Sequence, residues 1–236
     1  MAEGKQGGPI RVVAGCKPWH RVIFERELRP LPGIWHFVAA PHELSAAAMD
    51  ALAPEQIFLL HWSWKVPAGI VDRHECIGFH MTDLPYGRGG SPLQNLILRG
   101  HRTTKLTAFR LTADMDGGPV YAKEDLCLAG NAEEILLRAS HLAAAMIARI
   151  IATRPHPVPQ EGAVVSFPRR TPAESAIPAV KDLEALHDFL RMLDGHGYPP
   201  AFLVHGGFRY EFRRAARYDG RVEATVSITP AEGAGA

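Results

Sequence analysis

Residues 75–121 decide the fold prediction, and they read ECIGFHMTDLPYGRGGSPLQNLILRGHRTTKLTAFRLTADMDGGPVY. An apolar run ends at His80, a Gly/Pro-rich loop leads into a helix-forming segment, and an acidic loop carries Asp116 before two glycines. Ligands of open α/β sheets collect outside the carboxyl ends of strands. If the strands expected at residues 76–79 and 103–111 are neighbours, His80 and Asp116 open onto one crevice. We predict that this crevice is the active site.

The pattern of strands and helices continues on both sides of this stretch. Strands are expected at residues 10–14, 34–39 and 56–61, with helices at 18–28 and 42–52 between them. Further along, Ser91 is expected to cap a helix at 91–99, and Asn131 with Glu134 a long helix that ends at 154. A strand at 120–128 lies between these helices. This alternation predicts βαβ units and an α/β fold with a Rossmann-like, mostly parallel sheet.

A Pro-rich connector at residues 155–159 predicts a domain boundary. The interpretation is a catalytic domain at 1–155 and a small α+β subdomain at 160–236. The subdomain should contain an extended segment at 163–168, a helix at 182–193 and an antiparallel sheet from strands 201–204, 208–215 and 222–228. Its turns are expected at the Gly206-Gly207 and Asp219-Gly220 pairs. Residues 1–9 and 230–236 are expected to be frayed or disordered.

The composition indicates an ordinary soluble globular protein, with 47% hydrophobic and 22% charged residues. A net charge of +1 predicts no bulk attraction to polyanions. Three scattered cysteines are too few for a disulfide framework or a zinc knuckle. The start lacks the apolar run of a secretory signal, and no window approaches the ~20 apolar residues of a membrane span. We therefore predict a cytoplasmic protein with reduced cysteines and no membrane association.

Cofactor and metal motifs are missing from the expected places. Residues 15–18, GCKP, lack the G-x-G-x-x-G of a dinucleotide fold. Gly87, Gly89 and Gly90 lack the GK[ST] ending of a P-loop, so turn chemistry explains them better. The histidines show no ligand spacing supported by a carboxylate or cysteine. The sequence therefore predicts neither a dinucleotide site nor a metal site.

Two motifs resemble those of the N10-formyltetrahydrofolate-dependent formyltransferases. Residues 80–94, HMTDLPYGRGGSPLQ, resemble the family's H-x-S-L-L-P-x-x-R-G-x-x-P-x-Q, and residues 111–121 resemble M-D-x-G-L-D-T-G-D-I-L. The resemblance implies transfer of a formyl group from N10-formyltetrahydrofolate to an amine. It makes His80 the group that polarises the formyl oxygen or shuttles the proton, because an imidazole titrates near working pH. It makes Asp116 the carboxylate that orients that imidazole.

The same resemblance places the folate beside the end of the third strand and the loop before Asp116. The implied cofactor-binding residues are Trp62, Ser63, Trp64, Val66, Thr112 and Asp114. Plain packing remains the alternative for the two tryptophans. Arg88 is expected to orient the acceptor or, alternatively, to brace its own loop.

One position departs from the family pattern. The family has an asparagine two residues before the histidine, and this sequence has Gly78. The oxyanion must then be met by His80, a backbone N–H, water or another side chain, because loss of one uncompensated donor costs about 10²–10³ in rate. Residues 81–97, MTDLPYGRGGSPLQNLI, are similar to a branch of sugar-amine formyltransferases associated with nonulosonic acids and surface glycans.

The charge of the C-terminal region guides the choice of acceptor. Nine basic residues after position 159 face ten acidic ones, whereas tRNA binding requires a surplus of Lys and Arg contacts to phosphate. The region is also shorter than the barrel of the tRNA enzymes, so we predict no nucleic acid partner. The expected acceptor is an amino sugar or a nucleotide-linked amino sugar.

Other functions remain open at this stage. A hydroxyornithine-type or carrier-bound amine is the nearest alternative acceptor. A folate- or sugar-nucleotide-binding module, or a hydrolase of formyl-folate, would fit a site weakened by Gly78. The short C-terminal region also suggests a homodimer contact.

Overall fold

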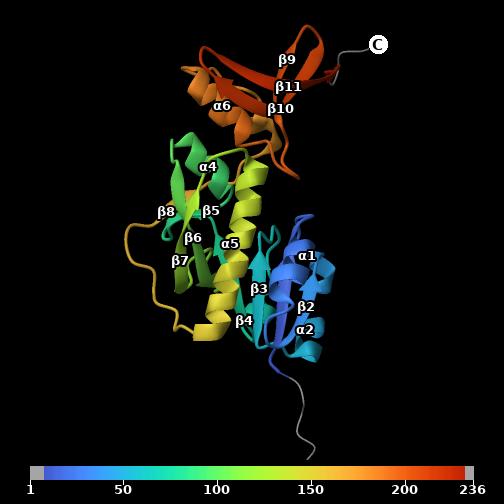
Figure 1. The fold of residues 1–236 in the computed structure, drawn as a ribbon, viewed down its shortest axis with the longest axis vertical. Coiled ribbons are helices and arrows are strands. Elements are labelled where there is room, and N and C mark those ends of the chain that lie inside the picture. The colour runs from blue at the N-terminus through green and yellow to red at the C-terminus, as the bar shows by residue number, and fades with distance from the viewer. Residues whose placement is uncertain (1–7, 232–236) are drawn as a thin grey trace, which may run out of the picture. The chain divides into compact units, whose positions relative to one another are not determined.

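The computed structural model describes residues 8–231, which form two compact units (Figure 1). Unit 1 comprises the residues up to Arg88 together with Lys105–Leu126 and Arg138–Ser166. Unit 2 comprises Gly89–Thr104, Cys127–Leu137 and the residues from Phe167 onward. The units are therefore interleaved along the chain, whereas the sequence prediction divided it consecutively at residues 155–160.

Unit 1 is built on a six-stranded sheet with the order β2-β1-β3-β4-β6-β7. The first four of these are mutually parallel: β1 (Ile10–Gly15), β2 (Ile34–Val38), β3 (Gln56–Leu60) and β4 (Glu75–His80). β6 (Thr103–Arg110) runs antiparallel to β4, and β7 (Val120–Cys127) lies at the edge. The predicted Rossmann-like, mostly parallel α/β sheet is confirmed.

Helices cover both faces of this sheet, as its parallel strands require. On one face, α2 (Ala46–Leu52) and α3 (Ala68–Val71) bury Met49 and Ile70 against Ile57 and Leu59 of β3. On the other, α5 (Ala132–Thr153) brings Ala143 beside strand side chains such as Phe79. One helix was expected at residues 18–28. The structure has instead a short helix, α1 (His20–Ile23), followed by a π-helical turn at Phe24–Leu28.

Capping chemistry is confirmed at α5 and corrected at two other helices. Asn131 Oδ1 accepts a hydrogen bond from the Glu134 N–H (2.9 Å), and Glu134 Oε2 accepts one from the Asn131 N–H (2.8 Å). Ser91 does not cap α4 (Pro92–Leu98), because its backbone is left-handed and its hydroxyl accepts from the Arg170 N–H. α2 begins after Ser45, whose hydroxyl accepts from the Ala48 N–H, and not at residue 42.

Contrary to the sequence expectation, α5 has the length and hydropathy of a membrane-crossing helix, and no other helix in the described part of the chain does. Half of its most apolar 18-residue window is buried inside the protein. The core side chains on this helix include Ile135, Met146 and Ile150. A helix that packs into the core of a soluble protein has the same composition.

Unit 2 contains α4, α6 (Leu183–Arg191) and a three-stranded antiparallel sheet. Its strands are β9 (Ala201–His205), β10 (Phe208–Tyr218) and β11 (Arg221–Pro230), in the order β11-β10-β9. The predicted helix, strands and turns are confirmed here, but Pro230 belongs to β11 and is not disordered. The predictions for residues 1–7 and 232–236 lie outside the described residues. A strand pair between β5 (Tyr86–Gly89) and β8 (Val165–Phe167) includes the predicted extended segment and one strand, β5, that was not predicted.

A buried histidine makes the stability of unit 1 depend on pH. His20 is fully buried, its Nδ1 accepts a hydrogen bond from the Lys17 N–H (3.2 Å), and its Nε2 lies 3.2 Å from the Ser140 hydroxyl. Burial, with a smaller contribution from the Lys17 charge, lowers the pKa of His20 to about 4. The folded protein therefore holds this ring neutral.

We expect the free energy of unfolding to fall between pH 6.5 and about pH 4, where the unfolded chain binds a proton at His20 and the folded chain does not. Each pH unit in this window costs about 1.4 kcal/mol for one such group. His20→Gln should remove that part of the slope in urea unfolding measured across this range. The exposed His42→Gln serves as the control, and an unchanged slope in His20→Gln would contradict the assignment.

Candidate functional site

His80 ends β4 with its side chain nearly buried, on the sheet face that also carries Gly78 and Phe109. The imidazole stands edge-on to the Phe109 ring, with 6.5 Å between the ring centroids. Its Nε2 lies 2.8 Å from the Gly87 carbonyl oxygen. A carbonyl can only accept, so Nε2 carries the hydrogen and donates it. In the neutral ring, Nδ1 is therefore the nitrogen with a lone pair.

The Gly87 carbonyl is held in place by the loop between β4 and β5. The Tyr86 N–H donates to the Asp83 carbonyl (3.0 Å), which closes a turn just before Gly87. The fully buried Thr82 points its hydroxyl at the Gly87 oxygen (3.5 Å) and accepts, through its own carbonyl, from the Thr107 hydroxyl (2.6 Å). Gly87 has a φ of +78°, which glycine adopts without strain. The glycines of this loop thus shape a turn that presents a carbonyl to the histidine.

Asp116 meets His80, with its Oδ2 3.8 Å from Nδ1. The route differs from the prediction, which relied on parallel strands ending at the same edge. β6 is antiparallel to β4, and the Leu111 N–H donates to the Cys76 carbonyl, so the loop after β6 starts at the far end of β4. Cys76 and His80 are four residue steps apart along the strand, about 13 Å. Residues 112–118 must therefore fold back along the sheet to reach the histidine.

Two side chains that are distant in sequence hold this returning loop. Gln160 Nε2 donates to the carbonyls of Asp116 and Gly118, at 2.8 Å each. Arg88 donates to Gln160 Oε1 from Nε (3.1 Å) and Nη2 (2.7 Å). Through Gln160, Arg88 thus braces the loop at 112–118, and not its own loop as the sequence suggested. Its expected role toward the acceptor stays a prediction. Gln160 was not identified from the sequence, where it is one polar residue after a Pro-rich connector.

The residues predicted to bind folate lie around one apolar cluster of unit 1. Val66 is buried in this cluster, and Trp62 and Leu111 pack against it. Trp64 is 46% exposed and stands edge-to-face with Trp62, with 4.9 Å between ring centroids. The other three predicted residues are exposed: Ser63, Thr112 and Asp114. The segment at 62–66 and Leu111 at the start of the loop therefore contact the same apolar cluster, and the Trp64 ring is partly exposed beside it.

Gly78 leaves no space for the asparagine of the resembling family. A Cβ built there would lie 2.8 Å from Leu111 Cδ1 and 3.0 Å from Phe109 Cε1. Both neighbours are apolar, so the three heavy atoms nearest to this position among the described residues offer no hydrogen-bond donor. Apolar side chains, Phe109 and Leu111, therefore line the space beside His80 and Gly78.

His61, at the end of β3, adds no positive charge beside this site. Burial lowers its pKa to about 3, with further contributions from His20, Lys17 and His80. Its backbone is left-handed, with φ +50°, and its carbonyl accepts a hydrogen bond from the Cys16 thiol (3.0 Å). The ring is therefore neutral near neutral pH.

Comparisons with known proteins agree with this architecture. A family model described as the C-terminal domain of methionyl-tRNA formyltransferase matches residues 172–229. The solved structure "Methionyl-tRNA formyltransferase from Clostridium thermocellum" is 40% identical, with a TM-score of 0.91, and the match covers 94% of this chain and 100% of that one. The chain belongs to the formyltransferase family.

Curated formyltransferases are longer than the region they share with this chain. The methionyl-tRNA formyltransferase of Corynebacterium urealyticum is 27% identical over 195 residues, which are 75% of this chain and 58% of the relative. That of Acidothermus cellulolyticus is 33% identical over 144 residues, 56% of this chain and 43% of the relative. The chain thus spans about half the length of the curated formyltransferases it matches.

Gly78 gives the first test of the site's packing. We expect Gly78→Ala to lower the free energy of unfolding by about 1–3 kcal/mol, because its methyl group would overpack against Leu111 and Phe109. Gly69→Ala in α3 is the matched control, since its nearest new contact is Arg73 Nη2 at 3.5 Å and alanine favours a helix. Urea unfolding of both variants decides the point. Equal stability of the two variants would contradict this expectation and show that Leu111 and Phe109 can shift to accept the methyl group.

Proposed function

We propose that this protein transfers a formyl group from N10-formyltetrahydrofolate to the primary amine of a small acceptor. The observation that carries the proposal is the pairing of His80 Nδ1 with Asp116 Oδ2 at 3.8 Å, while Nε2–H is committed to the Gly87 carbonyl. Membership of the formyltransferase family supports the reaction class.

The pair suits an amine on chemical grounds. In the neutral imidazole, Nδ1 is an acceptor and the Asp116 carboxylate is an acceptor. At 3.8 Å the two atoms are too far apart to share a proton directly. An amine nitrogen carries two or more N–H groups and can donate to both atoms from about 2.9 Å. A hydroxyl, with one hydrogen, would satisfy only one of them.

In this scheme the amine nitrogen attacks the formyl carbon, the bond from that carbon to N10 of the folate breaks, and a proton moves from the amine to N10. His80 Nδ1 accepts the proton from the amine and returns it to the leaving nitrogen. Asp116 stabilises the imidazolium while it holds that proton. Because Phe109 and Leu111 fill the space beside Gly78, the oxyanion must be stabilised by His80, a backbone N–H, water or a side chain from another position.

The donor fits the region around Trp62 and the loop after Leu111. The exposed Trp64 ring offers a surface on which a flat pterin can stack. The backbone of residues 112–114 offers amide and carbonyl groups to the polar edge of that ring. The cofactor-binding set remains Trp62, Ser63, Trp64, Val66, Thr112 and Asp114.

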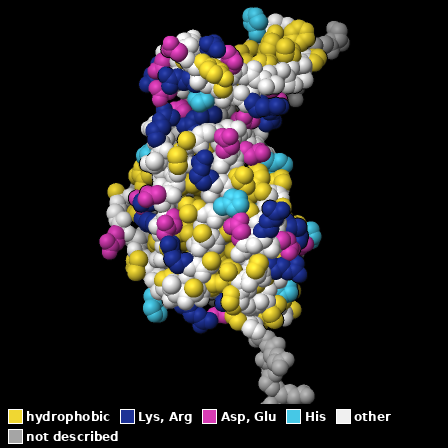
Figure 2. All heavy atoms as spheres, viewed as in Figure 1, with side chains coloured by type: hydrophobic (Ala, Val, Ile, Leu, Met, Phe, Trp, Pro, Cys, Tyr) yellow, Lys and Arg dark blue, Asp and Glu magenta, His cyan; other side chains and the backbone are white. Residues whose placement is uncertain are grey.

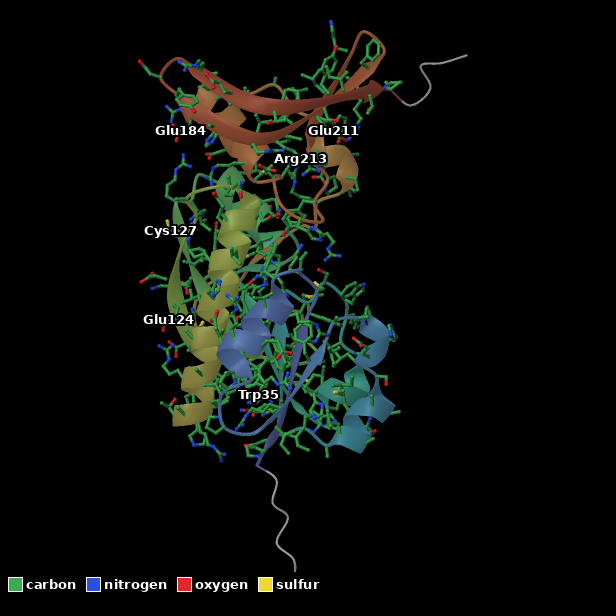
Figure 3. All side chains as sticks on the ribbon, turned by 45° about the vertical axis from the view of Figure 1, so that its right-hand side comes forward. Trp35, Glu124, Cys127, Glu184, Glu211 and Arg213 are labelled. Atoms are coloured by element: carbon green, nitrogen blue, oxygen red, sulfur yellow. The ribbon has the colours of Figure 1, made fainter. Side chains whose placement is uncertain are left out.

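Charge pairing in unit 2 supports a small acceptor, an amino sugar or its nucleotide-linked form. Within the stretch matched by the family model, five arginines lie within 4.0 Å of a carboxylate: Arg191, Arg209, Arg213, Arg217 and Arg221. Glu184 lies on α6, and Glu211 and Arg213 lie on β10 (Figure 3). The visible face of this region shows basic and acidic side chains intermixed (Figure 2). The neighbouring carboxylates offset the charge of these arginines, which lowers the positive potential available to a polyphosphate backbone.

Methionyl-tRNA is the second candidate acceptor, because relatives that this chain matches carry that name. Both acceptors present a primary amine to the same pair, so the catalytic assignment holds for either. A direct comparison of acceptors separates them.

We expect His80→Asn and Asp116→Asn each to lower amine-dependent release of tetrahydrofolate by about 10²–10⁴-fold. The assay mixes protein and N10-formyltetrahydrofolate with amino sugars, hydroxyornithine or methionyl-tRNA, and follows the absorbance of tetrahydrofolate. The matched controls are His74→Asn and Asp50→Asn, which alter a second His–Asp pair (3.5 Å) away from the site. Full turnover in both site variants would refute the assignment.

The same assay separates the other functions considered for this chain. Release without any amine would mean hydrolysis of formyl-folate. Binding of formyl-folate without release would mean a binding module.

A further inference from the structure

We propose that Gln160 is a positioning residue that holds Asp116 in register with His80, an inference that rests on the proposed function. Gln160 lies after the connector formed by residues 155–159, which the sequence analysis interpreted only as a domain boundary. All the contacts in this argument lie within unit 1.

The bonding capacity of the Gln160 carboxamide is matched to its surroundings in only one orientation. Its oxygen accepts from Nε and Nη2 of Arg88, which has no acceptor to offer. Its nitrogen donates both hydrogens, one to the Asp116 carbonyl and one to the Gly118 carbonyl. The reversed amide would place an oxygen against two carbonyl oxygens and an NH₂ group against a guanidinium. The side chain is therefore fixed in one orientation, in which it accepts two hydrogen bonds and donates two.

The residue that Gln160 holds has a backbone that needs support. Asp116 has a φ of +50°, a left-handed conformation that residues other than glycine keep only where their surroundings impose it. Its loop has also run back from the far end of β4. Hydrogen bonds to the carbonyls of Asp116 and Gly118 grip the loop on both sides of Gly117. This grip fixes the direction in which the Asp116 side chain leaves the backbone.

Gln160 can hold the loop because the connector is itself fixed. The Val120 N–H donates to the Val158 carbonyl (2.7 Å), and the Val158 N–H donates to the Val120 carbonyl (2.9 Å). This pair of bonds ties the connector to the first residue of β7, two residues after the loop ends at Gly118. Arg88, in β5, holds the other side of the carboxamide. Gln160 thus links the Asp116 loop to two strands, β5 and β7, and these fix the position of the carboxylate.

Gln160→Glu is the sharpest test, because glutamate keeps the shape and the attraction to Arg88 but loses both donors to the carbonyls. We expect kcat for formyl transfer to fall by about 10²-fold with KM for both substrates unchanged. Backbone amides of residues 112–118 should exchange with deuterium about tenfold faster in the ligand-free protein.

Gln56→Glu is the matched control. Gln56 also accepts from an arginine, Arg11, and donates to an acceptor, Glu75, but it starts β3 and lies at the opposite end of the sheet from His80. This variant should lower thermal stability and leave kcat and the exchange of residues 112–118 unchanged.

A double-mutant cycle shows whether Gln160 acts through Asp116. Added to Asp116→Asn, Gln160→Glu should lower kcat by less than about twofold further, because the group it positions is already lost. An equal loss of kcat in both backgrounds, or unchanged exchange of residues 112–118, would overturn the inference. If the wild-type protein transfers no formyl group to any amine, the proposed function fails, and the exchange data alone then decide whether Gln160 holds the loop.

Discussion

The hydrogen bond from His80 Nε2 to the Gly87 carbonyl is the constraint on which the site depends. It fixes which nitrogen carries the hydrogen, and so it decides that the other nitrogen faces Asp116. The loop around Thr82 and Tyr86 holds the Gly87 carbonyl within hydrogen-bond distance of His80. In the proposed mechanism, the Gly87 carbonyl thus gives His80 the position and tautomer of a proton acceptor.

Apolar side chains form one side of this site. Phe109 and Leu111 fill the space next to Gly78, and His61 stays neutral because burial lowers its pKa. In such surroundings the attraction between an imidazolium and a carboxylate is stronger than in water. This attraction requires the Asp116 carboxylate to stay close to His80, although Asp116 belongs to a loop with no regular secondary structure. The hydrogen bonds of Gln160 and Arg88 hold that loop in place.

The parts of the structure that follow from local patterns were predictable from the sequence. Strand alternation located β1 to β4, and the spacing of Asn131 and Glu134 located the start of α5, because both signals act within a few residues. Ser91 misled because the same residue type can accept from a distant backbone N–H, here that of Arg170, as well as cap its own helix. The meeting of His80 with Asp116 was expected from the neighbouring strands and from the motif resemblance. The route of the Asp116 loop was not, because the direction of β6 depends on the whole sheet. Gln160 left no periodic signal, because its four hydrogen bonds join segments 42 to 72 residues apart.

The interleaved construction of the two units constrains how this chain is made. Unit 2 draws on Gly89–Thr104 and Cys127–Leu137 as well as on the residues from Phe167 onward. During synthesis on the ribosome, apolar side chains of α4 such as Leu93, Leu96 and Ile97 emerge long before the C-terminal segment that completes their unit. Neither unit is finished when the other begins, so the nascent polypeptide cannot fold one domain at a time. Those side chains therefore lack part of their unit until the residues from Phe167 onward have been synthesised.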